Sequence, residues 1–496
     1  MVNRDSGSAP PAGHRGRLRP LATLALLFLA VSASADDLHP CHVPGLAHEA
    51  MCGEVSRPLD PARTDGVHID VHYLVFSAKA RNKQTTPIFL LAGGPGQSAI
   101  GVAPALVGLF ARLNNRRDIV FVDQRGTGHS APLQCDDETR QSLARSAESS
   151  RDLADVARCR EKLSKLPYGD LRFFTTSLAM QDLDAVRVAL GAPQVDLVGE
   201  SYGTRAALEY MRLYPKAVRR VVLDGVAPPD LDLSTSFAKD TDAALDSVFA
   251  ACEAEPRCHA DQPHLRQDWT RLLESLPKAV SAAHPLTGAV ERFTLTREMV
   301  TGLVRGPLYA PWIAEALPTA ISAAAMGRYE PLLGLGSVME SRPGTAVAQG
   351  MHFSVVCAED LAVEKSAVAA AALDDVAVRY KRVCRDWPRG TVPKGFYRVP
   401  ATTVPTLLLS GGLDPVLPPR HAARVAAQLG ASALNVVVPN AGHNVLSVGC
   451  MHDVLFDFID AANDAAALKI KTGCAHDVPR PPAFRPASLP PAKVAP

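Results

Sequence analysis

Charge of neither sign is in excess in this sequence of 496 residues. It holds 52 lysine and arginine residues against 51 aspartate and glutamate residues, and its formal net charge is +1. No half of the chain is a basic arm, so nucleic acid is not an expected partner. The CxxC and HExxH spacings of metal sites are also missing, which disfavours a metal centre.

Long hydrophobic runs and internal repeats are absent as well. Beyond the N-terminal region, no stretch has the length and apolarity of a transmembrane helix, which needs about 20 apolar residues. With 47% hydrophobic and 21% charged residues, the chain can still bury a large core. At roughly 150 residues per domain its length allows three domains, although α/β folds with insertions often count as one or two.

The N-terminus carries the pattern of an export signal. Arginines at positions 15, 17 and 19 precede an apolar run over 21–31, and Ala33-Ser34-Ala35 supplies the small residues of an A-x-A site. The pattern predicts a signal peptide over 1–35 with cleavage after Ala35. A membrane anchor is the alternative, but the run is short for a bilayer. We expect an exported protein, periplasmic or extracellular, with no stable membrane insertion after cleavage.

Ten cysteines fit this prediction, because an even number in an oxidising compartment favours disulfides. Sequence alone does not fix their connectivity, and metal ligation or free buried thiols are the alternatives. We favour pairing between neighbours in the sequence, since short loops close readily. The expected pairs are Cys41 with Cys52, Cys135 with Cys159, Cys252 with Cys258, Cys357 with Cys384, and Cys450 with Cys474.

Short apolar runs alternate with helical patterns along much of the chain. A continuous run such as PIFLLA at 87–92 is typical of a strand that is buried on both faces. Helices are expected at 177–190 and 205–214. The expected strands lie at 67–78, 87–92, 118–122, 195–198, 221–223, 406–409 and 436–438. This alternation predicts an α/β fold with a mostly parallel sheet covered on both faces.

One interval breaks the alternation and divides the chain. Residues 228–400 are rich in alanine and leucine, with helical stretches and no evident series of buried strands. We interpret them as a helical cap inserted into a core formed by 36–227 and 401–478. Residues 479–496 form a proline-rich tail that we expect to be extended or disordered.

The sequence Gly199-Glu200-Ser201-Tyr202-Gly203 matches G-x-S-x-G. It lies between the expected strand VDLV and the expected helix TRAALEYMRLY, which is the setting of a nucleophile elbow. The glycines allow a tight turn that exposes the serine hydroxyl, so Ser201 is the predicted nucleophile. A glycine-rich structural turn is the alternative.

A serine nucleophile needs a base, and the base needs an acid that orients it. In this setting the chain order is serine, acid, histidine. Asp414 follows the expected strand TLLL, and His443 follows the expected strand VVV, so both belong to loops at the carboxyl edge of the sheet. A plain turn at Asp414 and a surface histidine are the alternatives, but three matches in the right order favour a triad.

Acyl transfer also needs N–H donors for the developing oxyanion. The loop Ala92-Gly93-Gly94-Pro95-Gly96 follows the expected strand PIFLL. Pro95 has no N–H, so we predict an oxyanion hole formed by the N–H groups of Gly94 and Tyr202. The loop can also serve simply as a tight turn, and the two roles are compatible.

Together these motifs resemble the prolyl iminopeptidase and tripeptidyl aminopeptidase family of α/β-hydrolase serine peptidases. The resemblance rests on the loop at 93–96, the segment DQRGTGHS at 123–130, the elbow at 199–203 and the Asp414 and His443 segments. Residues 400–475 resemble the C-terminal domain of the tripeptidyl branch. The resemblance implies an α/β-hydrolase fold with a large helical cap, a peptide substrate with a free N-terminus, and no metal or organic cofactor.

The chain also departs from the iminopeptidase pattern. Ala92 stands where many iminopeptidases have histidine, and Glu200 and Tyr202 replace a small residue and tryptophan. These differences are closer to the tripeptidyl branch, so we do not expect strict specificity for proline.

An exopeptidase of this kind must recognise a charged amine, for which a carboxylate is the simplest partner. The segment ending in Glu359-Asp360 resembles the family segment that carries such acids. We predict that Glu359, or else Asp360, binds the substrate amine, the alternative being an ordinary acid pair at a helix start. Asp123 and Arg125 are expected to hold a loop rather than to contact substrate.

The sequence therefore predicts an exported serine aminopeptidase that works through an acyl-enzyme. Ser201 attacks, His443 is the base and Asp414 orients it. An esterase or lipase is the nearest alternative, because one triad serves both chemistries. A binding protein that has the fold but no activity is a second alternative, against which the intact triad argues.

Overall fold

The computed structural model describes residues 38–135, 142–146, 149–231, 233–340, 346–361 and 375–485. The predicted signal peptide, with its cleavage site after Ala35, lies outside these residues. The end of the proline-rich tail, from 486 onward, lies outside them as well.

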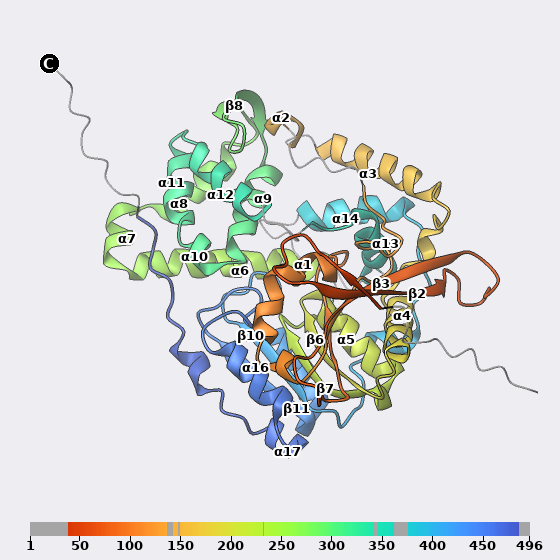
Figure 1. The fold of residues 1–496 in the computed structure, drawn as a ribbon. Coiled ribbons are helices and arrows are strands. Elements are labelled where there is room, and N and C mark those ends of the chain that lie inside the picture. The colour runs from red at the N-terminus through yellow and green to blue at the C-terminus, as the bar shows by residue number, and fades with distance from the viewer. Residues whose placement is uncertain are drawn as a thin grey trace, which may run out of the picture. The chain divides into compact units, whose positions relative to one another are not determined.

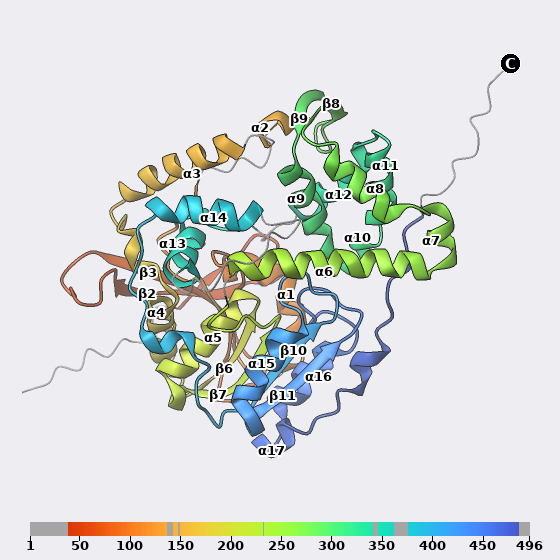
Figure 2. The same ribbon diagram turned by 180° about the vertical axis from the view of Figure 1, so that it is seen from behind.

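A nine-stranded sheet forms the centre of the core (Figures 1 and 2). Its strands are β1 (His39–Cys41), β2 (Ala50–Pro58), β3 (His68–Phe76), β4 (Ile88–Leu91), β5 (Ile119–Val122), β6 (Val195–Glu200), β7 (Val218–Asp224), β10 (Thr406–Gly411) and β11 (Ala433–Val438). They lie in the order β1-β2-β3-β5-β4-β6-β7-β10-β11. The strands from β5 to β11 in this order pair in parallel, and β1, β2 and β3 form an antiparallel edge. The predicted mostly parallel sheet is confirmed.

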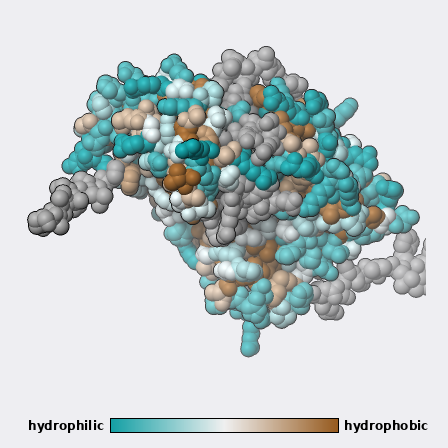
Figure 3. Space-filling view, turned by 90° about the horizontal axis from the view of Figure 1, so that it is seen from above, coloured by the Kyte–Doolittle hydropathy of each residue, from teal (hydrophilic) through white to brown (hydrophobic). Residues whose placement is uncertain are grey.

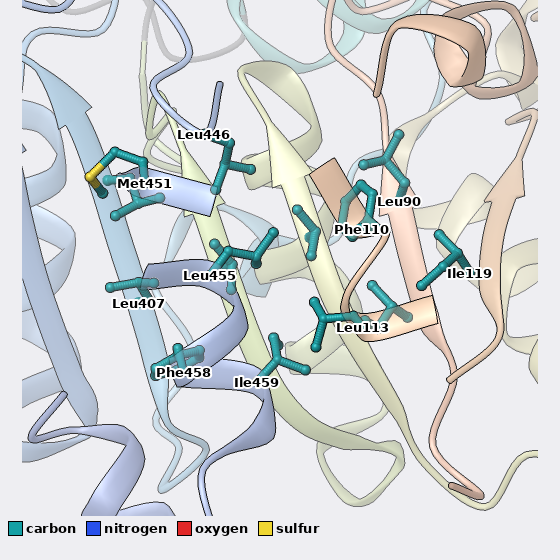
Figure 4. Close-up of a cluster of buried hydrophobic side chains, with 14 of the residues drawn as sticks. Leu90, Phe110, Leu113, Ile119, Leu407, Leu446, Met451, Leu455, Phe458 and Ile459 are labelled. Carbon is teal, nitrogen blue, oxygen red and sulfur yellow. The ribbon is translucent and has the colours of Figure 1, made fainter. Parts of the chain in front are cut away.

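Helices cover both faces of this sheet, and every residue of β4, β5, β6 and β10 is buried as a result. On one face lie α1 (Ala99–Leu106) and α16 (Met451–Asp460). Leu455 of α16 belongs to the same buried cluster as the sheet residues Leu90 and Leu407 (Figure 4). On the other face lie α4 (Thr176–Ala189), α5 (Tyr202–Leu213) and α15 (Pro419–Leu429). The other helices outside the segment between β7 and β10 are α2 (Leu143–Ser146), α3 (Ser149–Ser164) and α17 (Asp464–Ala467).

Between β7 and β10 the chain is mainly helical. The helices are α6 (Leu233–Ala254), α7 (Pro256–Asp261), α8 (Leu265–Glu274), α9 (Arg297–Leu308), α10 (Pro311–Ala314), α11 (Leu317–Ala325), α12 (Glu330–Glu340), α13 (Gln349–Glu359) and α14 (Asp375–Asp386). Leu272, Val304 and Ile321 belong to a buried cluster separate from those at the sheet. A hairpin of β8 (Lys278–Ala283) and β9 (Val290–Leu295), which the sequence analysis did not predict, joins them. Its strands mix exposed and buried residues, so they lack the continuous apolar run of a strand that is buried on both faces.

The inserted segment is bonded both to the core and to the C-terminal tail. His421 Nε2 of α15 lies 3.0 Å from Asp240 Oδ2 of α6. In the tail, Arg480 Nε donates to Glu315 Oε1 at 2.8 Å, and Phe484 N donates to the Glu315 carbonyl at 3.0 Å. The first residues of the proline-rich tail are therefore held against the inserted helices.

All ten cysteines form disulfides, and the predicted pairing of neighbours is found throughout. The Cα–Cα distances of the five bridges range from 5.0 to 6.4 Å, which is the ordinary range for disulfides. One bridge, Cys357–Cys384, ties α13 to α14. The prediction of a disulfide-bonded protein is confirmed.

The surface shows no dominant apolar face in the view from above, where hydrophobic residues form small separate groups among hydrophilic ones (Figure 3). Exposed large apolar side chains include Val290 of β9 and Trp312 of α10. Within the described part of the chain, no helix has both the length and the apolarity needed to cross a membrane.

Candidate active site

Ser201 occupies a strained turn between β6 and α5. Its φ and ψ angles are 55° and −122°, a conformation that residues other than glycine rarely adopt. A Cβ atom on Gly199 would lie 2.5 Å from the Gly203 carbonyl oxygen, and one on Gly203 would collide with the carbonyl of Leu91. Both glycines of the motif are therefore required by close backbone approach. The turn is fixed by a bond of 2.8 Å from Ser201 N to the Asp224 carbonyl.

His443 and Asp414 form a bonded pair on neighbouring loops after β11 and β10. His443 Nδ1 lies 2.8 Å from Asp414 Oδ2. The other oxygen, Asp414 Oδ1, accepts bonds from the backbone N–H groups of Val416 (2.9 Å) and Leu417 (2.8 Å). Burial alone would raise the pKa of Asp414, but the imidazole and these donors hold it below its ordinary value. The acid is thus kept ionised, which suits an orienting role.

The imidazole is also held from the inserted segment. His443 N donates to the Tyr309 carbonyl at 3.0 Å, and the Tyr309 ring packs edge-on against the imidazole with a centroid distance of 5.1 Å. Tyr309 lies between α9 and α10. A histidine from the core is therefore positioned in part by the insertion.

Asp224, the last residue of β7, is a site residue that the sequence analysis did not identify. Its buried carboxylate accepts bonds of 2.8–2.9 Å from the N–H groups of Val445 and Leu446, directly after the histidine loop. A Cβ on Gly225 would lie 3.1 Å from His443 Cε1, so this strand end touches the imidazole. The sequence feature that could have identified Asp224 is an acidic residue at the carboxyl end of a buried strand, next to the strand that leads into the elbow.

Three carboxylates surround the imidazole. Glu200 and Asp224 are register partners on β6 and β7, and burial raises their pKa values to about 8 and about 6 respectively. Burial alone would lower the pKa of His443, but the charges of Asp414, Asp224 and Glu200 outweigh it and raise that pKa above its ordinary value. The acidic surroundings stabilise an imidazolium, which is the charge that a catalytic base acquires.

The glycine-rich loop lies against the elbow. A Cβ on Gly93 would lie 3.2 Å from Ser201 Cβ. Gly94 has a φ of 109°, and a Cβ there would lie 2.7 Å from Gly96 N, so a side chain at Gly94 would be strained. Tyr202 begins α5, where unpaired backbone N–H groups and the helix dipole favour negative charge. The glycine-rich loop and the start of α5 thus both adjoin the nucleophile's turn, and the roles of Gly94 and Tyr202 as oxyanion donors stay predictions.

The inserted segment also holds this loop. Ala348 N donates to the Gly96 carbonyl at 2.9 Å. His352 of α13 bonds through Nδ1 to the Pro95 carbonyl (3.1 Å) and through Nε2 to Tyr380 Oη of α14 (2.9 Å). Burial lowers the pKa of His352 to about 4, so the ring is neutral near pH 7 and can donate from Nδ1 and accept at Nε2.

Asp123 and Arg125 have structural partners, as predicted. Asp123 accepts bonds from Ser98 Oγ (2.7 Å) and from Ile100 N (3.0 Å). Arg125 pairs with Asp182 at 2.6 and 2.8 Å and donates to backbone carbonyls. Both residues are buried and hold neighbouring loops.

Glu359 and Asp360 already have protein partners. Thr176 donates to Glu359 from its backbone N (2.7 Å) and from its hydroxyl (2.8 Å), so both carboxylate oxygens are engaged. Asp360 is paired with Arg205 at 2.5 Å. The sequence predicted acids available to a substrate amine, and these contacts place both acids in the packing around Tyr202 and α5. Their amine-binding role stays a prediction, against which the contacts count.

Together the site residues can carry out acyl transfer. A hydroxyl on a strained turn and an imidazole with an ionised partner are two of the parts that this chemistry requires, and the N–H groups of Gly94 and Tyr202 are the predicted third part. In the described ranges, no three histidine, cysteine, aspartate or glutamate side chains are grouped so that they could hold a metal ion.

Comparison with known proteins agrees with this fold. Residues 86–335, half of the chain, match the family described as alpha/beta hydrolase fold, and residues 371–466 match the family described as TAP-like protein. The chain is 26% identical over 430 residues to the serine protease Hip1 of Mycobacterium tuberculosis, covering 78% of this chain and 80% of that protein. It is 30% identical over 262 residues to a tripeptidyl aminopeptidase of Streptomyces coelicolor (48% and 47% covered). It is 24% identical over 166 residues to a proline iminopeptidase of Neisseria meningitidis (34% and 41% covered). The predicted family resemblance is confirmed: the chain belongs to the α/β-hydrolase fold family.

Proposed function

We propose that this serine peptidase of the α/β-hydrolase superfamily is an exported aminopeptidase with Ser201, His443 and Asp414 as its triad. The observation that carries the proposal is the bonded His443–Asp414 pair at the same sheet edge as the strained Ser201 turn. The similarity to Hip1, to tripeptidyl aminopeptidases and to a proline iminopeptidase supports a peptide substrate. Five disulfides support export to an oxidising compartment.

The proposed mechanism gives each of these groups one role in acyl transfer. His443 takes the Ser201 proton through Nε2, the hydroxyl oxygen bonds to the scissile carbonyl carbon, and Asp414 stabilises the imidazolium. The N–H groups of Gly94 and Tyr202 receive the oxyanion. The bond from the carbonyl carbon to the departing nitrogen then breaks as His443 returns the proton to that nitrogen. Water, deprotonated by His443, cleaves the resulting ester and frees Ser201.

Substrate selection at the N-terminus is the part that separates an aminopeptidase from an esterase. A carboxylate that binds the substrate ammonium gains a charge-assisted hydrogen bond of about 1.5–3 kcal/mol. Acetylation of that amine leaves the carboxylate unpaired, so the loss exceeds the bond's own contribution. Peptide anilides with a free amine should therefore be cleaved about tenfold better, or more, than their N-acetyl counterparts.

The test compares kcat/KM for free and N-acetylated peptide p-nitroanilides, with Ser201→Ala as the control for contaminating activity. Equal rates on both substrates, together with fast hydrolysis of p-nitrophenyl esters, would contradict the proposed aminopeptidase activity and support an esterase instead. Labelling of the protein by a fluorophosphonate addresses the third possibility, because a binding protein without activity would not react.

A further inference from the structure

Glu200 is the last residue of β6 and directly precedes the nucleophile. It is only 9% exposed, and within the described residues its carboxylate makes no hydrogen bond and no ion pair. No Glu200 oxygen is among the fully enclosed polar atoms without a partner, so the carboxylate keeps some accessible surface although the side chain as a whole is buried. A largely buried carboxylate without a protein partner is costly and calls for an explanation. The location beside Ser201 points to a functional one.

The other acids around the elbow differ from Glu200 in this respect. Asp414 is bonded to His443 and Asp224 to two backbone N–H groups. Glu359 is bonded twice to Thr176, and Asp360 is paired with Arg205. Among these five carboxylates, Glu200 is the one whose oxygens no group of the described protein uses.

The surroundings of Glu200 favour a positively charged partner. Its electrostatic neighbours are the carboxylate of Asp224, which is its register partner on β7, and the imidazole of His443. Asp414 adds a further negative charge beside the imidazole, at Nδ1. Burial and the charge of Asp224 raise the pKa of Glu200 to about 8. A bound cation would favour the ionised form of this carboxyl group.

We propose that Glu200 binds the α-ammonium group of the substrate's first residue, an inference that rests on the proposed aminopeptidase activity. Glu200 and Ser201 are consecutive residues, and consecutive Cα atoms are about 3.8 Å apart. The Glu200 side chain therefore leaves the backbone close to the residue whose hydroxyl attacks the substrate. In a one-residue acyl group, the amine is two bonds from the carbonyl carbon that Ser201 attacks. A carboxylate beside the nucleophile therefore matches the release of single N-terminal residues.

The position of Glu200 next to Ser201 also distinguishes substrates that lose one residue from substrates that lose a tripeptide. In a tripeptidyl substrate the ammonium lies two residues farther from the scissile carbonyl, or about 7 Å along an extended chain. An acid next to Ser201 is then too close to the reacting bond to meet it. The Glu200 carboxylate thus assigns the protein to substrates whose ammonium is next to the scissile bond.

The experiment measures kcat/KM for alanyl and prolyl p-nitroanilides and for their N-acetyl counterparts. It uses the wild type, Glu200→Gln and the matched variant Glu359→Gln. We expect a free-amine preference of about tenfold or more in the wild type, a preference below about threefold in Glu200→Gln through a higher KM, and a retained preference in Glu359→Gln. In Glu200→Gln, fluorophosphonate labelling of Ser201 should remain measurable, because Ser201, His443 and Asp414 are retained, although its pH dependence should move to lower pH with the loss of one charge that raises the pKa of His443.

A tenfold preference that survives in Glu200→Gln overturns the inference, and so does an equal loss on both substrates, which would place Glu200 in support of the triad. A wild type without any preference overturns the proposed aminopeptidase activity instead. If turnover of Glu200→Gln is too slow to measure, protection of Ser201 from the fluorophosphonate by alanine amide and by N-acetylalanine amide gives the same ratio. Equal protection by both in the variant, but not in the wild type, supports the inference.

Discussion

The core and the inserted segment contribute to the site in different ways. The core carries the candidate reacting groups, each at the carboxyl end of a buried strand: Ser201 after β6, Asp414 after β10 and His443 after β11. The insertion carries none of these three, but it holds the groups around them. Its Tyr309 carbonyl binds His443 N, and its His352 binds the Pro95 carbonyl.

This difference has an energetic consequence. Removing a core group should remove a chemical step, whereas removing an insertion contact should only loosen the geometry of the step. Both kinds of substitution should lower kcat, but by different factors. The members of a triad act as one unit, whereas a single positioning hydrogen bond contributes about 1 kcal/mol. Four substitutions, ordered from the largest expected effect to the smallest, can test the comparison.

His443→Ala should lower kcat by about 10⁴-fold or more, because no other base is bonded to an orienting acid in the described site. Steady-state kinetics on a free-amine p-nitroanilide measures the loss, with His421→Ala as the control. His421 Nε2 lies 3.0 Å from Asp240 Oδ2, and His421 has no proposed chemical role. Similar losses in the two variants would contradict the assignment of His443.

Asp414→Asn should lower kcat by about 10³–10⁴-fold and should also move the pH profile. Neutral His443 is the active form, so activity is lost as pH falls through its pKa. Because that pKa is raised in the folded protein, with Asp414 as the largest raising charge, the acid limb of kcat/KM in the wild type should lie above pH 6.5.

Removal of the Asp414 charge should shift that limb to lower pH. The measurement is kcat/KM between pH 5 and pH 9 for both proteins. An acid limb that stays at the same pH in the variant would show that another group sets the pKa of the base.

His352→Ala, a change in the insertion, should lower kcat by about five- to tenfold with little change in KM, because the bond to the glycine-rich loop is lost while the triad residues are unchanged. The ring is neutral near pH 7, so the pH profile should not move. Tyr380→Phe is the matched control, since it removes the partner of Nε2 but leaves the bond to Pro95. A His352→Ala protein with a lower melting temperature and an unchanged kcat would show that His352 contributes to packing and does not position the loop for catalysis.

Arg480→Ala should change activity least, by about twofold or less, and stability more. The change leaves Glu315, which is 3% exposed, without its ion-pair partner, and should lower the free energy of unfolding by about 1–3 kcal/mol. Denaturation in urea measures it. Arg485→Ala is the control, because its pair with Asp261 is exposed on both sides and should contribute about 1 kcal/mol or less.

The sequence predicts the core better than the insertion for a physical reason. Strands buried on both faces, such as β4 and β6, are continuous apolar runs, and the turns after them carry glycine, so their signals are local. The partly exposed hairpin β8–β9 has no such run. The partners of Glu359 and Asp224 could not be predicted either, because each depends on a backbone group 183 or 221 residues away.

The most direct test of the account is the mapping of a fluorophosphonate adduct. We expect intact mass spectrometry to show one adduct per chain, peptide mapping to place it on Ser201, and Ser201→Ala to lose both the adduct and the peptidase activity. An adduct on a different serine, or a Ser201→Ala protein that still cleaves peptide anilides at the wild-type rate, would contradict the assignment of the nucleophile and of the triad built around it.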